Sequence, residues 1–355
     1  MNAYRSLNMN INQKKYKPLI KVNMKKYGIL LLLLMSISFA FGQQKESGIV
    51  KIRGTRLAYP LINTWIAEFK KVYPNIQVSI APSAPADSID FSIAAYALTD
   101  KELTETRGGV AFTRYVQLPV ANSKRADLAQ LQARGFSEAD FRKLYFTPET
   151  PTFFASSQNP SPITLYTREK PACAAKTFAA HFDHDPKTIQ GVGVKGDDQD
   201  LAKAVKADVN GISFNNLGFI YDVNTRKVVE GLAVIPLDLN ENGKVDKEEQ
   251  VYGSLDEVIA YVEKTNNDKF VTENVNFLFN KNSSNVAAGI FLHWALTQGQ
   301  QFSHALGFLS FDDQTLQAQR ALAGATFKTL SASSCEGADN LMKTRRTSKT
   351  ASNNP

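Results

Sequence analysis

Short runs of alternating apolar and polar residues recur along the chain, with helix-like patterns between them. Residues 48–53 alternate and predict a first strand, and residues 76–80 and 89–93 predict two more. Pro60 is expected to open an amphipathic helix between the first two strands, which stops at Tyr73-Pro74. One face of this helix would carry Leu61, Trp65, Ile66, Phe69 and Val72.

The same alternation continues in the second half of the chain, which predicts an α/β fold. Ser137 and Ser254 are each expected to begin a helix, because Ser is a favoured N-cap residue. An apolar helix is expected over residues 286–297, and another helix should contain Phe178 and Phe182. Strands are expected at residues 116–121, 163–167, 217–221, 228–237 and 306–311.

The N-terminal region has the pattern of an export signal. Lys25 and Lys26 precede an apolar run over residues 28–40, and Ala40-x-Gly42 is a small-x-small cleavage pattern. The strongly apolar part spans about 12–14 residues, shorter than the roughly 20 that cross a bilayer as a helix. We therefore expect residues 1–42 to be a Sec signal peptide with an overlong n-region, cleaved near Gln43. The mature protein would then be periplasmic.

Charge gives no support for nucleic-acid binding. The chain has a formal net charge of +7, but residues 1–42 hold seven Lys and Arg and no acidic residue. Without them, 34 basic residues face 34 acidic ones. Residues 326–355 carry further basic residues and are expected to form a disordered basic tail. The charge excess therefore belongs to the two ends, and we expect no nucleic-acid partner.

The sharpest local motif is a candidate calcium loop. Residues 238–249 fit the pattern D-x-N-x-N-G-x5-E, in which hard oxygen ligands alternate before a sharp turn at Gly243. Pro236 excludes a helix before the loop, so we expect a strand–loop–helix site with a structural Ca2+. The alternative is an ordinary polar loop. The expected ligands are Asp238, Asn240, Asn242, the backbone carbonyl of Lys244, Asp246 and Glu249.

No motif indicates catalysis, and we expect that the protein is not an enzyme. The chain has no G-x-S-x-G, H-E-x-x-H or P-loop pattern. His181 and His184 could contribute to a zinc site, but such a pair is more typical of a solvated helix end. Cys173 and Cys335 could form a disulfide in an exported protein or stay as two free thiols.

Taken in order, these segments resemble the periplasmic phosphate-binding protein of ABC importers, a member of the type II periplasmic binding protein superfamily. The resemblance spans roughly residues 49–325 and lies in the order of many weak motifs. The matching positions are Gly54-Thr55, Pro60, Trp65, Phe69 and Tyr73-Pro74 in the opening turn and helix; Asp90-Phe91 at a strand end; residues 118–121; Ile163, Arg168 and Phe178; residues 216–220; and Gly299-Gln300 with residues 306–308.

The resemblance implies a two-lobed protein in which each lobe is a mixed sheet flanked by helices, with the calcium loop as an insertion. Lobe one would comprise residues 48–117 and 223–325, and lobe two residues 118–222. Phosphate or a related oxyanion would bind between them, and the protein would act as a monomer linked to uptake through an inner-membrane ABC permease. The implied oxyanion-binding residues are Thr55, Arg56, Ser83 and Arg168.

The chain departs from the family's pattern at two places where oxyanion ligands are expected. Ala94-Ala95 stands where the family has Ser-Asp, and residues 172–174 read Ala-Cys-Ala where it has Ser-Gly-Thr. Hydrogen bonds to charged groups contribute about 1.5–3 kcal/mol each, so these losses would weaken anion binding strongly. The alternative function is therefore a binding-protein fold that binds no oxyanion and acts as an envelope interaction or scaffold protein.

Overall fold

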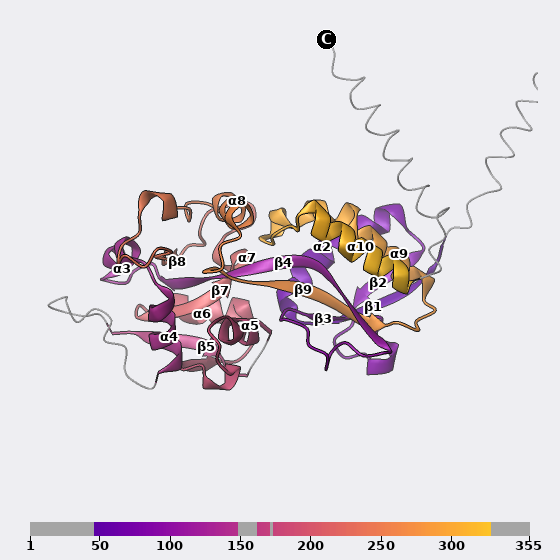
Figure 1. Ribbon diagram of the computed structural model, residues 1–355, viewed down its shortest axis with the longest axis horizontal. Coiled ribbons are helices and arrows are strands. Elements are labelled where there is room, and N and C mark those ends of the chain that lie inside the picture. The colour runs from indigo at the N-terminus through magenta and orange to yellow at the C-terminus, as the bar shows by residue number, and fades with distance from the viewer. Residues whose placement is uncertain (1–45, 148–161, 171–172, 328–355) are drawn as a thin grey trace, which may run out of the picture. The chain divides into compact units, whose positions relative to one another are not determined.

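Nine strands form one mixed sheet in the computed structural model, which describes residues 46–147, 162–170 and 173–327 (Figure 1). The strands in sheet order are β2 (Ile76–Ile80), β1 (Gly48–Gly54), β3 (Phe91–Ala94), β9 (Val271–Asn280), β4 (Arg107–Asn122), β7 (Gly211–Asn216), β5 (Thr164–Arg168) and β6 (Val192–Val194), with β8 (Leu232–Val234) paired to β4 beside this path.

The two ends of the sheet are parallel and its centre is antiparallel. β1 pairs in parallel with β2 and β3, and β5 pairs in parallel with β6 and β7. Between them, β9 runs antiparallel to β3 and β4, while β4 runs antiparallel to β7 and β8. The parallel strands need crossover connections, which the helices supply.

Nine α-helices are found in the described residues, and the first of them shows how the sequence specifies its element. Its buried residues include Leu61, Trp65 and Phe69, spaced four apart, so they lie on one face. The helices are α2 (Tyr59–Val72), α3 (Leu128–Arg134), α4 (Glu138–Phe146), α5 (Cys173–His181), α6 (Asp198–Ala207), α7 (Leu217–Ile220), α8 (Leu255–Thr265), α9 (Val286–Leu296) and α10 (Asp313–Thr326).

Six short 3-10 helices connect these elements in the part of the chain that the structure describes. They are η1 (Arg56–Ala58), η2 (Ala86–Ser88), η3 (Pro186–Thr188), η4 (Lys247–Glu249), η5 (Gln298–Phe302) and η6 (His304–Leu306).

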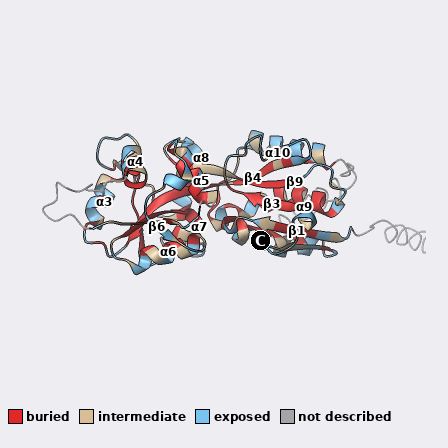
Figure 2. Cartoon of the chain, turned by 90° about the horizontal axis from the view of Figure 1, so that it is seen from below, coloured by how far each residue is buried: buried red, intermediate tan, exposed pale blue. Residues whose placement is uncertain are grey.

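Two large apolar clusters form the interior, seen as the buried strands and helix faces in Figure 2. In the first, Phe112 of β4 stacks on Phe277 of β9 with ring centroids 4.2 Å apart. In the second, Phe178 of α5 stacks on Phe214 of β7 at 3.7 Å. Each fully buried aromatic ring contributes about 1.5–3 kcal/mol by leaving water.

The strands β4 and β9 pass through both clusters. Along β4, Tyr115 belongs to the first cluster and Val116 to the second. Along β9, Val271 belongs to the second cluster and Val275 to the first. The two cores are therefore joined by continuous hydrogen-bonded strands. The second cluster also takes in residues from 234 to 271, a region that the sequence analysis placed with lobe one.

Several sequence-based predictions of elements are confirmed. The strands at 48–53, 76–80, 89–93 and 163–167 correspond to β1, β2, β3 and β5, each to within two residues at either end. Ser137 caps α4 in a capping box with Asp140, and the Ser254 hydroxyl accepts a hydrogen bond from the Glu257 backbone N–H at the start of α8. Val72 of α2, in contrast, is 45% exposed rather than buried.

Other predictions are wrong. Residues 217–220 form the short helix α7, and the strand lies just before it as β7. Residues 304–306 are 3-10 helix, and only Leu309 of the expected last strand makes a bridge, to Arg114. The strand expected at 228–237 is confined to β8. Uniform apolar runs do not distinguish a buried strand from a buried helix turn, which explains these errors.

No helix within residues 46–147, 162–170 and 173–327 is long and apolar enough to cross a membrane. The expected signal peptide, its cleavage site and residues 328–355 of the expected basic tail lie outside the described residues. The first two residues assigned to that tail are ordered instead, since α10 extends to Thr326 and Phe327 is buried in the first cluster.

Candidate anion-binding site

Arg168 is the last residue of β5, and its guanidinium lies beside the first turn of α6. Nη1 of Arg168 is 3.9 Å from Oδ1 of Asp198, and the two side chains are only 8% and 6% exposed. Arg168 Nη1 is buried and has no hydrogen-bond partner among the residues that the structure describes. An unmet donor of this kind costs about 1–3 kcal/mol, more for a charged group, so the arrangement is open to a further acceptor.

A capping box at the start of α6 positions Asp198 beside Arg168. Asp197 is the N-cap: its side chain accepts a hydrogen bond from the Gln199 backbone N–H at 3.0 Å. The Asp200 carboxylate in turn accepts from the Asp197 backbone N–H at 2.9 Å, which completes a capping box. Asp198 is then the first helical residue, where the helix dipole favours negative charge.

Arg56 lies at the same helix start through the neighbouring carboxylate. Its Nη1 is 3.4 Å from Oδ2 of Asp197, with side-chain exposures of 58% and 22%. An ion pair this exposed contributes about 0–1 kcal/mol. Two consecutive carboxylates of α6 thus bring Arg56 and Arg168 together, although these residues are far apart in sequence.

The turn before Arg56 depends on a glycine. Gly54 has φ of +136°, and a Cβ at this position would lie 2.3 Å from the Ile93 carbonyl oxygen. The Thr55 backbone N–H donates to that same oxygen at 3.2 Å, while the Thr55 side chain makes no capping hydrogen bond. The close approach of β1 and β3 therefore fixes where Thr55 and Arg56 emerge.

Burial shifts the pKa of the Asp198 carboxyl. Desolvation raises the pKa of this carboxyl, and the nearby Asp197 raises it further. Arg168 and the Asn216 side chain oppose the rise but do not cancel it. Asn216 is 3% exposed, and within the described residues neither its amide nitrogen nor its amide oxygen has a hydrogen-bond partner at normal geometry. Arg168, Asp198 and Asn216 thus form a buried polar group with unused hydrogen-bonding capacity.

Ser83 does not join this group. It is an exposed residue in the loop after β2, and among the described residues no hydrogen bond or ion pair links it to Thr55, Arg56 or Arg168. Of the four expected oxyanion ligands, the structure therefore gathers the two arginines around one helix start, with Thr55 adjacent to Arg56 in the chain.

Ala95, at the position where the resemblance implies an acidic ligand, makes contacts within the protein. Ala95 is fully buried at the end of β3, and its carbonyl oxygen accepts from the hydroxyls of Tyr115 at 2.8 Å and Thr177 at 3.1 Å. Thr177 belongs to α5, so this helix contacts the strand end directly. The acidic residue near Arg168 is instead Asp198, which sequence reasoning missed. The D-D-Q-D run at residues 197–200 marks a helix start, but its pairing with β5 is a long-range contact.

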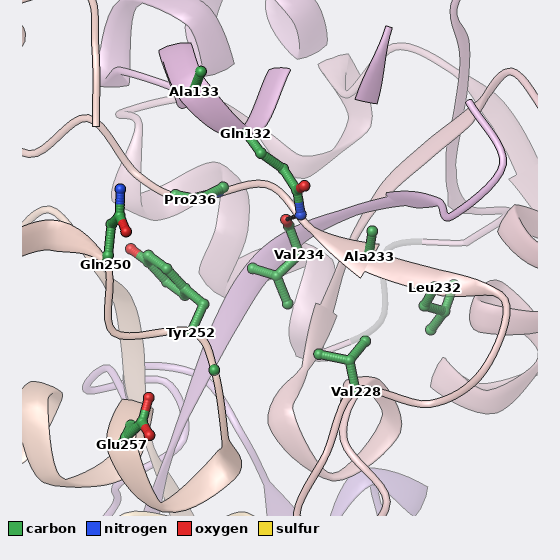
Figure 3. Close-up of a pocket in the computed structure, with 11 residues that line it drawn as sticks. Gln132, Ala133, Val228, Leu232, Ala233, Val234, Pro236, Gln250, Tyr252 and Glu257 are labelled. Carbon is green, nitrogen blue, oxygen red and sulfur yellow. Dashed lines mark hydrogen bonds between the residues drawn. The ribbon is translucent and has the colours of Figure 1, made fainter. Parts of the chain in front are cut away.

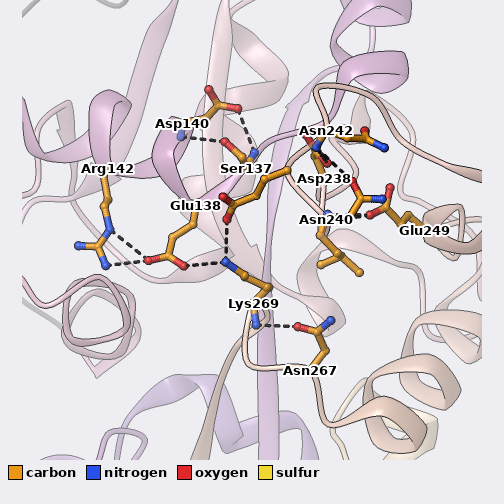
Figure 4. Close-up of polar contacts among 12 residues, drawn as sticks. Ser137, Glu138, Asp140, Arg142, Asp238, Asn240, Asn242, Glu249, Asn267 and Lys269 are labelled. Carbon is orange, nitrogen blue, oxygen red and sulfur yellow. Dashed lines mark hydrogen bonds and ion pairs between the residues drawn. The ribbon is translucent and has the colours of Figure 1, made fainter.

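The candidate calcium loop is stabilised by hydrogen bonds from its own backbone (Figure 4). Asp238 and Glu249 are 5% and 4% exposed. Asp238 accepts from the backbone N–H groups of Asn242 and Gly243, and Glu249 from those of residues 239, 240 and 246. Gly243 has φ of +84°, as the sharp turn requires.

The exposed carboxylate of the loop has a different partner. Asp246 accepts hydrogen bonds from Lys244, Asn240 and Asn242, and the Lys244 contact is the main cause that lowers the pKa of Asp246 to about 2. Among the described residues, no three His, Cys, Asp or Glu side chains lie close enough together to hold a metal ion by themselves. A calcium ion here would therefore depend on amide and carbonyl oxygens as well as on the three carboxylates.

The loop is also tied to the second core by Lys269 (Figure 4). Lys269 Nζ lies 2.7 Å from Glu241 of the loop and 3.3 Å from Glu138 at the start of α4. Glu138 in turn pairs with Arg142 at 2.7 Å. Because Lys269 immediately precedes Phe270 and β9, this chain of charges connects the loop to one of the two strands that cross both cores.

The cavity of about 640 Å3 near β8 does not suit an anion (Figure 3). It is lined by β8, by Gln132 and Ala133 of α3, and by Tyr252 and Glu257 near the start of α8. Among the described residues that line it, Glu257 is the only charged one. A negative charge with no basic partner repels an oxyanion, so the arginines around α6 remain the candidate site.

Comparison with solved structures identifies the architecture. The chain matches a proposed phosphate-binding protein from Planctomyces limnophilus (13% identity, TM-score 0.51), covering 79% of this chain and 99% of that one. It also matches a proposed phosphate ABC transporter substrate-binding protein from Clostridium perfringens, solved with bound phosphate (12% identity, TM-score 0.57, 75% and 100% covered). The chain shares the fold of these two solved proteins.

A third match, an ABC-type phosphate transport receptor from Vibrio cholerae, agrees with this assignment of the fold (11% identity, TM-score 0.53, 74% and 100% covered). No protein-family model matches the chain, and no curated protein sequence matches it. The mixed α/β architecture expected from the resemblance is therefore confirmed. At these identities the matches describe the fold, and the ligand has to be argued from this chain's own residues.

Proposed function

We propose that this protein is a periplasmic solute-binding protein that binds phosphate or a related oxyanion at Arg168. The observation that carries the proposal is the buried Arg168 guanidinium, whose Nη1 has no hydrogen-bond partner in the described part of the chain. Arg56 supplies a second positive charge at the same helix start, and Thr55 supplies a hydroxyl. Charge-assisted hydrogen bonds from a guanidinium suit a dehydrated oxyanion.

Asp198 would give the site its selectivity. A phosphate that still carries a proton can donate a hydrogen bond to the Asp198 carboxylate, whereas fully ionised sulfate has no proton to donate. The same carboxylate would repel sulfate, because like charges a few ångströms apart cost free energy in a buried site. Asp198 would thus take the role that the resemblance assigns to the Asp missing at residue 95.

The strands β4 and β9 would act as the hinge between two lobes. The division of the interior into two clusters supports this proposal, as does the passage of both strands from one cluster to the other. The second lobe would then include the calcium loop and α8 in addition to residues 118–222, since these pack in the second cluster. Export through the signal at residues 1–42, monomeric state and delivery to an ABC permease belong to the same proposal.

Calcium would order the loop at residues 238–249. The expected ligand atoms are all oxygens, they come from alternate residues, and Gly243 has a positive φ. These features fit a Ca2+ loop of the extracellular kind, with a dissociation constant of about 0.1–1 mM. The chain's own residues would bind and orient the ion, and the bound ion would stabilise the native state by mass action. Asp246 would have to exchange its Lys244 contact for the ion.

Isothermal titration tests the oxyanion proposal. The mature protein is titrated with phosphate and with sulfate in calcium-containing buffer. We expect phosphate binding that is lost in Arg168→Ala and retained in Arg142→Ala, which removes an equal charge from the pair with Glu138 on α4. Binding that survives Arg168→Ala would contradict the assignment of the site.

A second function has specific support. Both arginines already have a carboxylate partner, and the Ala95 carbonyl is occupied by Tyr115 and Thr177. A binding-protein fold closed by its own carboxylates would serve as an envelope interaction or scaffold protein. Absence of heat with both anions, together with capture of a membrane partner by the mature protein, would favour this function.

A further inference from the structure

An apolar cavity of about 240 Å3 lies next to the candidate anion site. Its walls include Leu57 of η1, Tyr115 of β4, Phe219 of α7 and Phe308 after η6. Asn216 is the one residue in the lining with a side-chain amide. The Tyr115 hydroxyl is already engaged, because it donates to the Ala95 carbonyl at 2.8 Å.

The cavity and the anion site share Asn216, and a chain neighbour of Arg56 also lines the cavity. Asn216 lines the cavity, and its side chain is also close enough to Asp198 to lower the pKa of that carboxyl. Leu57 directly follows Arg56, whose guanidinium pairs with Asp197. The apolar space therefore begins where the group of Arg168, Asp198 and Asn216 ends.

The size and chemistry of the cavity indicate an organic occupant. An engineered apolar cavity of about 150 Å3 stays dry and binds benzene, so 240 Å3 holds a group somewhat larger than a phenyl ring. A bound water needs about two to four polar partners, and the lining side chains offer one free amide. Inorganic phosphate would leave this space unused.

We propose that the solute is an organic oxyanion, with its anionic head at Arg168 and Asn216 and a small aromatic or branched apolar body in the cavity lined by Leu57 and Phe308. This inference rests on the proposed function, because it takes the head group to be an oxyanion. It goes further by assigning the second half of the ligand.

Titration with three probes tests the inference: inorganic phosphate, methylphosphonate and phenylphosphonate. The two phosphonates share a head group and differ in apolar bulk. We expect phenylphosphonate to bind at least about tenfold more tightly than methylphosphonate, because burial of a ring removes apolar surface from water. Equal affinity for the two phosphonates would overturn the inference and leave the proposed function intact.

Cavity-filling variants provide the structural control. Val223→Phe places a ring in the proposed cavity, and Val228→Phe makes the same change in the larger cavity near β8. We expect Val223→Phe to remove the advantage of phenylphosphonate while methylphosphonate binding is kept, and Val228→Phe to change neither. Loss of the advantage in both variants would overturn the placement. Failure of all three probes to bind the wild-type protein would overturn the proposed function itself.

Discussion

Asp198→Asn separates the contribution of charge from that of shape at the buried pair. At 3.9 Å and an effective dielectric constant of about 20, the attraction between Arg168 and Asp198 is about 4 kcal/mol. Burial opposes it, because the effective penalty for desolvating each ion is several kcal/mol. The raised pKa of Asp198 means that desolvation, its largest cause, exceeds the attraction to Arg168.

The raised pKa of Asp198 determines at which pH this carboxyl stabilises or destabilises the fold. An acid whose folded-state pKa is raised stabilises the protein fully below its unfolded pKa, near 3.8 here, and loses that contribution as pH rises through the folded pKa. At neutral pH the buried Asp198 carboxyl therefore destabilises the fold. We expect Asp198→Asn to leave the free energy of unfolding unchanged or to raise it, by about 1.4 kcal/mol for each pKa unit of the shift.

Urea denaturation at pH 7 measures the effect, with Asp197→Asn as the matched control. Asn is as good an N-cap as Asp, and the Arg56–Asp197 pair is exposed, so the control should change stability by less than about 1 kcal/mol. In the same samples, titration with sulfate should show binding that the wild type lacks, because the repelling carboxylate is gone. A loss of about 3 kcal/mol or more in Asp198→Asn would refute the reasoning, since the pair would then be a net stabilising contact.

Three further perturbations have defined outcomes. Calcium at 10 mM should stabilise the wild type by about 1–3 kcal/mol in thermal unfolding, and Glu249→Gln should abolish this increment whatever its stability without calcium; an undiminished increment would contradict the proposed site. The His304 pKa is raised chiefly by its hydrogen bond with Glu263, so the pair should stabilise the fold below about pH 6.5 and lose this effect as pH rises through the raised pKa; in His304→Gln the unfolding midpoint should no longer fall over that range. Ser137→Ala should cost about 1 kcal/mol, measured by urea denaturation, because it removes the hydrogen bond from the Asp140 backbone N–H; no loss would mean that the capping box does not stabilise α4.

Local patterns in the sequence predict much of the secondary structure. The apolar spacing of α2, the Ser caps of α4 and α8, and the alternation in β1 and β2 each depend on residues a few positions apart. β9 was not predicted, although it pairs with both β3 and β4. Its sequence includes Thr272, Glu273 and Asn274, and these polar residues interrupt the apolar alternation that marks a strand.

The candidate site was less predictable, because its geometry depends on topology. Arg168 could be named from the resemblance, but its partner Asp198 lies beyond β6 and reaches β5 only through the crossover to α6. Burial of Asn216 likewise depends on where β7 ends against α7. The calcium motif is the opposite case. Its residues are contiguous, so the sharp turn at Gly243 could be expected from the sequence alone, while the calcium ion itself stays a prediction.

The central place of β9 in the sheet has a consequence for how the molecule is made. β1, β2 and β3 come early in the chain, yet β3 is completed on one edge only by β9, and the Trp65 indole donates to the Gly299 carbonyl 234 residues later. A chain that emerges with its N-terminus first therefore cannot close its first core until almost all of it is available. Loop closure over such separations is slow, so the early segment should remain protease-sensitive and dependent on chaperones during synthesis. The first core is therefore completed by segments that are synthesised late. Truncation near residue 270 should leave the first third of the chain unable to fold.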